Sequence, residues 1–267
     1  MIDTVITFDG VLWDKDELVA RMIDNEFYYG YMGKNSLSSS SVKELLKSPR
    51  AYSNSVKYPQ EDCDAFMFGR LIHESILEPK KVFAYNIIDA NDKRSKTWKD
   101  AVKDNIPNTI LKRDYDRCIS LVDAYNNNDF TKDLLEHYNT EVPNVVLIDD
   151  VLFRVKADAL SLDGNTLEKS IIDLKTTADI SKFNKWTAMS YGYDCQAYIY
   201  CLAFGVHWQD YRFVVLDKTN KQFGIFDISE EFFESGKRKV HEAIDTYKKY
   251  FVNREEEINN YITTGTL

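Results

Sequence analysis

Two side chains of opposite charge stand two residues apart in the apolar segment 171–177. They are Asp173 and Lys175, and Leu174 lies between them. If the segment is a β-strand, both project from one face, because the side chains of a strand alternate between its faces. A carboxylate and an ammonium are costly in an apolar strand unless each has a partner. A divalent metal on the carboxylate and a water or phosphate on the amine would be such partners.

A second carboxylate stands on the strand that we expect to lie beside this one. Residues 153–160 alternate strictly between apolar and polar side chains, and Asp158 is on the polar face. A loop at 163–165 leads to the next strand, and so short a connection predicts adjacent antiparallel strands. Asp158 and Asp173 would then form a hard oxygen site suited to Mg²⁺ or Mn²⁺, with Lys175 oriented toward a hydrolytic water. The alternative is a solvated strand face of mixed charge.

Two predicted helices carry further candidate groups. The helix at 193–204 places Gln196 and Tyr200 one turn apart on one face, where both are donors for a phosphate or a metal-bound water. The helix at 64–77 carries His73, whose imidazole is a metal ligand in many proteins. Taken singly, each of these side chains is more often an ordinary core residue, so neither helix identifies a site alone.

The order of these residues resembles the PD-(D/E)XK nuclease superfamily, and specifically its RecB-like branch. The motifs, in chain order, are Gly69-x-x-x-His73, Asp158, Asp173-x-Lys175 and Gln196-x-x-x-Tyr200. The segments around Leu37 to Lys43, Ser48 to Arg50 and Phe68 to Pro79 further resemble the exonuclease VIII (RecE-type) C-terminal nuclease and its phage relatives. The resemblance covers about residues 37–249. Two departures are Asp173, where many members have Glu, and Ala157, where the superfamily name has Pro.

The resemblance implies a restriction-endonuclease-like fold of the α/β (α+β) class, with a mixed central sheet flanked by helices. It also implies in-line hydrolysis of a phosphodiester, with Mg²⁺ or Mn²⁺ stabilising the developing charge. The implied metal ligands are Asp158, Asp173, the Leu174 carbonyl and His73. Lys175 would position or activate the attacking water, and the substrate backbone would be held by Gln196 and Tyr200.

The net charge of −9 is unusual for a DNA enzyme. Binding depends on local potential rather than on the total, so we expect a basic channel within an acidic outer surface. The cations expected near the site are Arg154, Lys156, Lys169, Lys175, Lys182 and Lys185. If these cations are merely solvated, the negative net charge argues against nucleic-acid binding.

The start of a helix at 38–47 is rich in serine, with a lysine nearby, and such a terminus can bind a phosphate. An ordinary capped helix explains the same residues equally well. With this helix and the basic set in mind, the predicted DNA contacts are Ser38, Ser40, Lys43, Arg70, Lys156 and Lys182.

A chain of 267 residues suits one large domain. We expect a nuclease domain at 37–267, preceded by an extension or small subdomain at 1–36 that includes a Tyr/Gly-rich loop at 28–33. We expect no membrane span and no secretion signal. The four cysteines, Cys63, Cys118, Cys195 and Cys201, fit free thiols in a reducing cytoplasm. None follows Cys201, so we expect no iron–sulfur cluster of the kind that some RecB-like nucleases hold.

The leading interpretation is a metal-dependent DNA exonuclease that resects duplex ends for phage-type recombination or DNA processing. By resemblance, it would work in the cytoplasm of a phage-infected or prophage-bearing bacterium. It would act with a single-strand annealing protein and assemble as a ring-like trimer or tetramer. Two alternatives stay open: a structure-specific or single-strand endonuclease of the same fold, and a catalytically idle nucleic-acid- or protein-binding module. The complete motif set argues against the idle module.

Overall fold

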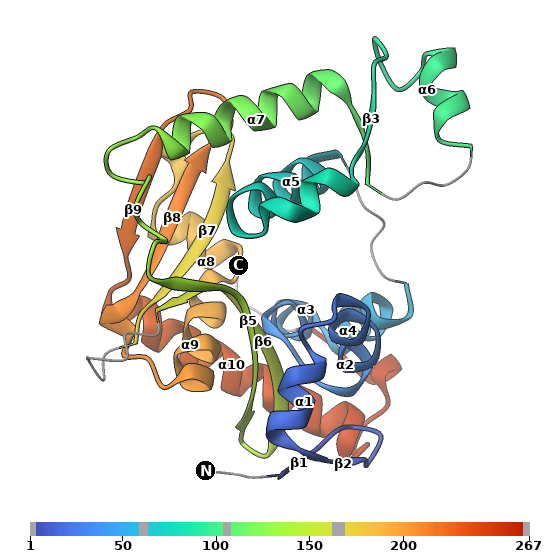
Figure 1. Cartoon of the computed structure of the whole chain (residues 1–267). Coiled ribbons are helices and arrows are strands. Elements are labelled where there is room, and N and C mark those ends of the chain that lie inside the picture. Colours follow the sequence, from blue (N-terminus) through green and yellow to red (C-terminus); the bar gives the residue numbers. More distant parts are fainter. Residues whose placement is uncertain (1–3, 59–63, 104–107, 162–168, 264–267) are drawn as a thin grey trace.

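A five-stranded mixed sheet forms the centre of the computed structural model, which describes residues 4–58, 64–103, 108–161 and 169–263 (Figure 1). The spatial order follows the chain: β5 (Tyr138–Ile148), β6 (Val151–Ser161), β7 (Ile171–Thr177), β8 (Tyr211–Asp217) and β9 (Phe223–Asp227). Strands β7 and β8 run parallel, and every other neighbouring pair is antiparallel. The predicted mixed sheet of the restriction-endonuclease-like fold is therefore confirmed.

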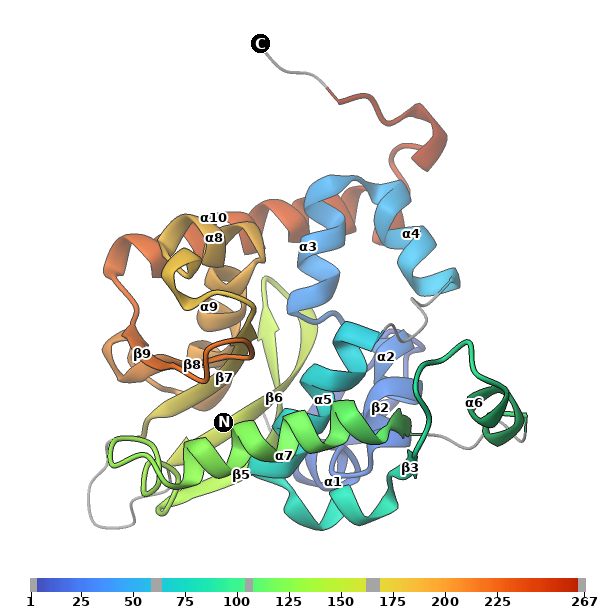
Figure 2. The same ribbon diagram turned by 90° about the horizontal axis from the view of Figure 1, so that it is seen from above.

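Helices cover both faces of this sheet (Figures 1 and 2). On one face α5 (Asp64–Leu77) and α7 (Lys112–Asn126) bury an apolar layer that includes Leu71, Leu121 and Leu174. On the other, α3 (Ser39–Lys47), α9 (Tyr193–Phe204) and α10 (Glu230–Tyr247) bury a larger layer that includes Val42, Ile199, Phe213 and Ile244. The predicted bounds of α5 and α9 are those observed. Helix α10 continues beyond Tyr247 as a π-helix, η5 (Lys248–Val252).

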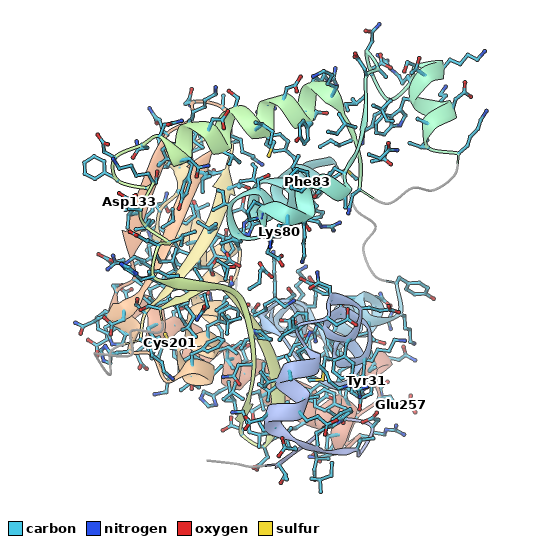
Figure 3. All side chains as sticks on the ribbon, in the orientation of Figure 1. Tyr31, Lys80, Phe83, Asp133, Cys201 and Glu257 are labelled. Atoms are coloured by element: carbon cyan, nitrogen blue, oxygen red, sulfur yellow. The ribbon has the colours of Figure 1, made fainter. Side chains whose placement is uncertain are left out.

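The N-terminal segment packs against the half of β5 and β6 that lies farthest from β7 (Figure 1). It contains the hairpin β1 (Thr4–Ile6) and β2 (Leu12–Asp14), helix α1 (Lys15–Arg21), the π-helix η1 (Phe27–Tyr31) and helix α2 (Met32–Asn35). The loop predicted at 28–33 is thus helical. The reason is tertiary, because Tyr28 and Met32 are buried in an apolar cluster with strand residues Val145 and Leu152. Tyr31 marks this segment in Figure 3.

The remaining elements connect these layers. After α3 come α4 (Pro49–Lys57) and, beyond α5, the 3₁₀ helix η2 (Pro79–Ala84). Strand β3 (Asn86–Ile88) pairs in parallel with β4 (Thr109–Leu111), and α6 (Lys96–Ala101) lies between them in the chain. Helix α8 (Lys185–Ser190) leads into α9. Four short 3₁₀ or π turns complete the order: η3 (Ile180–Lys182), η4 (Trp208–Asp210), η5 and η6 (Ile258–Asn260).

Two expectations fall partly outside the part of the chain that the structure describes, namely the loop at 163–165 and the state of Cys63. The other three cysteines are free and buried. Among the described residues, no helix combines the length and apolar character needed to cross a membrane.

Candidate active site

The two predicted carboxylates meet where β6 and β7 separate. The ladder between these strands ends at the pair Ala159–Ile172, and β7 continues only along β8. Asp158 and Asp173 are the next residues beyond that last pair. Here the Leu174 N–H donates to a side chain instead of to a strand carbonyl: Asp158 Oδ2 accepts this hydrogen bond of 2.8 Å. The divergence of the two strands therefore leaves room for polar groups that a continuous sheet would not leave.

Asp173 is buried, with only 1% of its surface exposed, yet each of its carboxylate oxygens has a donor. Lys175 Nζ donates to Oδ1, so the two side chains share a face, as strand alternation predicts. The hydroxyl of Tyr211, which is fully buried at the start of β8, donates to Oδ2 at 2.5 Å. These two charge-assisted bonds offset the cost of removing the carboxylate from water.

Lys175 is held as a cation by its neighbours. Burial lowers its pKa, but the charges of Asp173 and Asp158 outweigh burial, so the pKa of Lys175 lies above its ordinary value. Its Nζ also lies 4.7 Å from the centre of the Tyr193 ring, a favourable cation–π position. A protonated amine in this place can donate hydrogen bonds to a water or a phosphate oxygen.

Asp158 and His73 form the other side of the site. Burial, followed by the charge of Asp173, raises the pKa of Asp158 well above its ordinary value. His73, on α5, brings Nδ1 to 3.7 Å from Asp158 Oδ2 and hydrogen-bonds the Leu174 backbone. Burial, helped by Lys175, lowers the pKa of His73 to about 4, so its ring is neutral at pH 7. A neutral imidazole is the form that binds a metal.

The donor chemistry fits a divalent cation. No three His, Cys, Asp or Glu side chains in the described part of the chain already gather around one point. The contacts are instead pairwise: Asp158 contacts His73 and the main chain of Leu174, and the charge of Asp173 acts on Asp158. Mg²⁺ and Mn²⁺ prefer carboxylate and carbonyl oxygens, which the two aspartates and the main chain would supply. A cation there would also relieve the repulsion between Asp158 and Asp173, which is one cause of the raised pKa of Asp158.

Helix α9 brings one more predicted residue to these carboxylates. Tyr200 is buried, and its pKa is raised well above the ordinary value by burial and then by the charges of Tyr28, Asp173 and Asp158. The half-buried Gln196 lies one turn earlier on the same helix face. The structure therefore brings five predicted side chains together: His73, Asp158, Asp173, Lys175 and Tyr200. Gln196 lies on the same helix as Tyr200.

The three DNA contacts predicted on α3 have different surroundings. Ser38 caps the helix, because its hydroxyl accepts the Ser41 N–H in a capping box. Ser40 is exposed in the first turn. Lys43 places its Nζ over the ring of Tyr191, 5.8 Å from the ring centre.

The other three predicted DNA contacts lie on separate elements. Lys156 is 8% exposed; its Nζ donates to Asn25 Oδ1 at 2.7 Å and lies 4.4 Å from the centre of the Tyr28 ring. Lys182 is exposed and pairs with Asp179 at 3.2 Å. Arg70 is exposed on α5, one turn before His73.

Most cations of the expected basic channel bind groups within the protein itself. Arg154 donates to the carbonyls of Met32 and Ser36. Lys169 donates to the Phe204 carbonyl, and Lys185 pairs with Glu231 at 2.7 Å. These cations are spread over several elements and have partners inside the chain.

Several residues at the site were not predicted from the sequence. Tyr211 and Tyr193 contact Asp173 and Lys175, but nothing in their sequence positions separates them from ordinary core aromatics. Glu141 lies on β5 between Thr140 and Val142, which pair with the two neighbours of Asp158. Its positive φ of 54° is a backbone conformation that costs about 1 kcal/mol or more for a non-glycine residue. Burial, followed by the charge of Glu78, raises the pKa of Glu141 to about 6.

Comparisons with known proteins concern the family and the fold of the chain. A model of the family described as "PDDEXK-like domain of unknown function (DUF3799)" matches residues 38–260. Among solved structures, a crystal structure from Eubacterium rectale described as a "Putative exonuclease" superposes with a TM-score of 0.58 at 12% identity, covering 91% of this chain and 95% of that one. The crystal structure of SSO0001 superposes with a TM-score of 0.39 at 12% identity, covering 86% and 84%. No curated protein sequence matches the chain.

Proposed function

The chain belongs to the family of PDDEXK-like domains of unknown function, DUF3799, and from this premise we propose that it is a metal-dependent DNA nuclease. One observation carries the proposal: Asp158, Asp173 and Lys175 converge beside His73 at the point where β6 and β7 separate. A purely structural role does not account for a buried carboxylate beside a second carboxylate and an ammonium that are mostly shielded from solvent, because such groups are costly in a core.

The residues of the site divide the chemical work among them. Asp158, Asp173, His73 and the Leu174 carbonyl would hold the cation, which when bound would supply Lewis-acid stabilisation of charge on the phosphate. Lys175 would donate hydrogen bonds to the attacking water or to a phosphate oxygen, because its pKa stays above the ordinary value.

Two further contacts fix the orientation of these groups. Tyr211 fixes the second oxygen of Asp173, so that the carboxylate has one orientation. Tyr193 holds the Lys175 ammonium over its ring. Tyr200, buried beside the carboxylates, and Gln196, one turn earlier, would contact the DNA backbone.

We further propose that the enzyme is an exonuclease that resects duplex ends with Mg²⁺ or Mn²⁺. The RecE-type resemblance over residues 37–249 supports this choice, as does the description of the Eubacterium rectale structure as a "Putative exonuclease". The same resemblance supports phage-type recombination in a bacterial cytoplasm, a single-strand annealing protein as partner, and a ring-like trimer or tetramer. In this proposal residues 1–36 form an extension of the nuclease domain at 37–267.

Two substrates test the proposal. The purified protein is incubated with Mg²⁺ and linear duplex DNA carrying labelled 5′ ends, or with a covalently closed circle. An exonuclease degrades the linear DNA alone, Asp158→Ala abolishes the loss, and the release of label gives the polarity. The control is Asp116→Ala, which removes an exposed carboxylate paired with Lys112 on α7 and keeps full activity. Cutting of the circle supports the endonuclease alternative, and no cleavage with either metal refutes the nuclease.

A further inference from the structure

A line of aromatic rings and cations leads from Lys175 toward the protein surface. Its first ring is Tyr193, whose centre lies 4.7 Å from Lys175 Nζ. The second is Tyr191, whose ring centre is 5.6 Å from that of Tyr193 with planes 31° apart. A second cation stands at the outer end of the line, since Lys43 Nζ lies 5.8 Å from the Tyr191 ring.

The two rings differ in their surroundings. Tyr193 packs against Phe183 and Phe213 of the core, with ring centres 6.4 Å and 5.6 Å away. Tyr191, in contrast, has 54% of its surface exposed. Burying an aromatic side chain stabilises a fold, so an aromatic ring left open beside buried catalytic groups is available to a ligand.

The turn between α8 and α9 holds Tyr191 in this place. Gly192 follows it with a φ of +80°, a conformation that favours glycine. A Cβ built on Gly192 would stand 3.9 Å from Lys43 Cβ, so the turn lies directly against α3. The ring and the Lys43 ammonium are therefore presented together by a turn and the helix against which that turn packs.

We propose that Tyr191 is a stacking platform for an unpaired base of the DNA strand next to the bond that is cut, with Lys43 beside it for a neighbouring phosphate. This inference rests on the proposed nuclease function. An aromatic face stacks on any base, and a nearby cation neutralises the phosphate that accompanies the base. A base inside a duplex already stacks on both neighbours, so the platform selects a strand end that is frayed or single-stranded. The site would therefore take the end of one separated strand rather than an intact duplex.

The test uses duplex DNA with a short splayed end and 2-aminopurine at the terminal positions of one arm or the other. Binding is measured in EDTA, where no cleavage interferes, by the quenching of 2-aminopurine fluorescence that accompanies stacking. Wild type and Tyr191→Phe should quench one arm equally, because both keep the ring. Tyr191→Ala should lose the quenching and bind about ten-fold more weakly, which corresponds to about 1.4 kcal/mol of stacking.

The matched control is Phe130→Ala. Phe130 is another open aromatic, 81% exposed, in the segment between α7 and β5 that also contains Asp133, labelled in Figure 3. This variant should quench and bind as wild type does. In Mg²⁺, Tyr191→Ala should raise KM on splayed ends with a smaller change in kcat.

Equal quenching and equal affinity in wild type and Tyr191→Ala would overturn the platform even if both proteins cut DNA. An equal loss of quenching and affinity in Tyr191→Ala and Phe130→Ala would overturn the platform as well. A wild-type protein that cuts no DNA would refute the proposed function instead, and the quenching in EDTA would still decide whether Tyr191 stacks on a base.

Discussion

Replacing Tyr211 with Phe removes one oxygen from the core and leaves a buried carboxylate oxygen without its donor. The hydroxyl of Tyr211 lies 2.5 Å from Asp173 Oδ2, and the two residues are 0% and 1% exposed, so water cannot substitute. A hydrogen bond to a charged group contributes about 1.5 to 3 kcal/mol, and the loss of one partner carries the full desolvation cost of the other. We expect the free energy of unfolding to fall by about 2 kcal/mol, which lowers the Tm of a domain of this size by about 4 to 8 °C.

Urea denaturation in EDTA measures this change, with Tyr198→Phe as the matched control. Tyr198 is also buried, but its hydroxyl contacts a side chain that is partly open to solvent, His241, whose Nε2 lies 3.2 Å away. Removing the Tyr198 hydroxyl should cost less than about 1 kcal/mol, because water can reach the His241 ring and replace the lost hydrogen bond. DNA cleavage by Tyr211→Phe should also fall, by about ten-fold, because Asp173 loses its fixed orientation. Equal losses of stability in the two variants would refute the charged bond, and unchanged cleavage would refute its role in positioning.

Three further predictions concern charge, packing and metal. Burial, followed by the charge of Glu78, raises the pKa of Glu141 to about 6. The folded protein therefore loses stability as the pH rises from about 4.5 past 6, because Glu141 ionises less readily in the folded than in the unfolded chain. Glu141→Gln should therefore raise the free energy of unfolding by about 1 kcal/mol at pH 8, after allowance for solvent screening, and leave it unchanged at pH 4 in thermal melts. Gly236→Ala should cost about 3 kcal/mol in urea denaturation, because the new Cβ would stand 2.0 Å from the Asp194 carbonyl oxygen, whereas Gly30→Ala meets open space and should be neutral. Saturating Mg²⁺ or Mn²⁺, at about a hundred times Kd, should stabilise wild type by about 2.7 kcal/mol but leave the melting of Asp158→Asn unchanged. A wild-type melt that no metal shifts would contradict the donor set.

Much of the site was predictable because its residues lie on elements with strong periodicity. Strict alternation identified β6, and the apolar run around Asp173 identified β7. The short connection between them predicted the antiparallel pairing that brings Asp158 and Asp173 together. Helix α9 was predicted at its observed bounds, and the structure shows a glycine with positive φ at each end.

What the sequence did not predict depends on contacts between distant segments. The parallel pairing of β7 with β8 places Tyr211 beside Asp173, 38 positions apart in the chain. Lys156, predicted to face DNA, donates instead to Asn25, 131 positions away. The segment 28–33 is helical rather than a loop, because its apolar side chains pack on β5 and β6. None of these contacts leaves a local pattern in the sequence.

Hydrolysis of linear duplex DNA in Mg²⁺ by wild type, Asp173→Asn and Lys175→Ala tests the central claim most directly, with Asp116→Asn as the exposed-carboxylate control. If Asp158, Asp173 and Lys175 are the catalytic groups, wild type and Asp116→Asn cut the DNA, and chelation stops both. Asp173→Asn and Lys175→Ala stay folded by circular dichroism and cut at least a hundred-fold more slowly, a loss of about 2.7 kcal/mol of transition-state stabilisation. Normal turnover by the folded Asp173→Asn and Lys175→Ala proteins, or cleavage by wild type that persists without metal, would contradict the account.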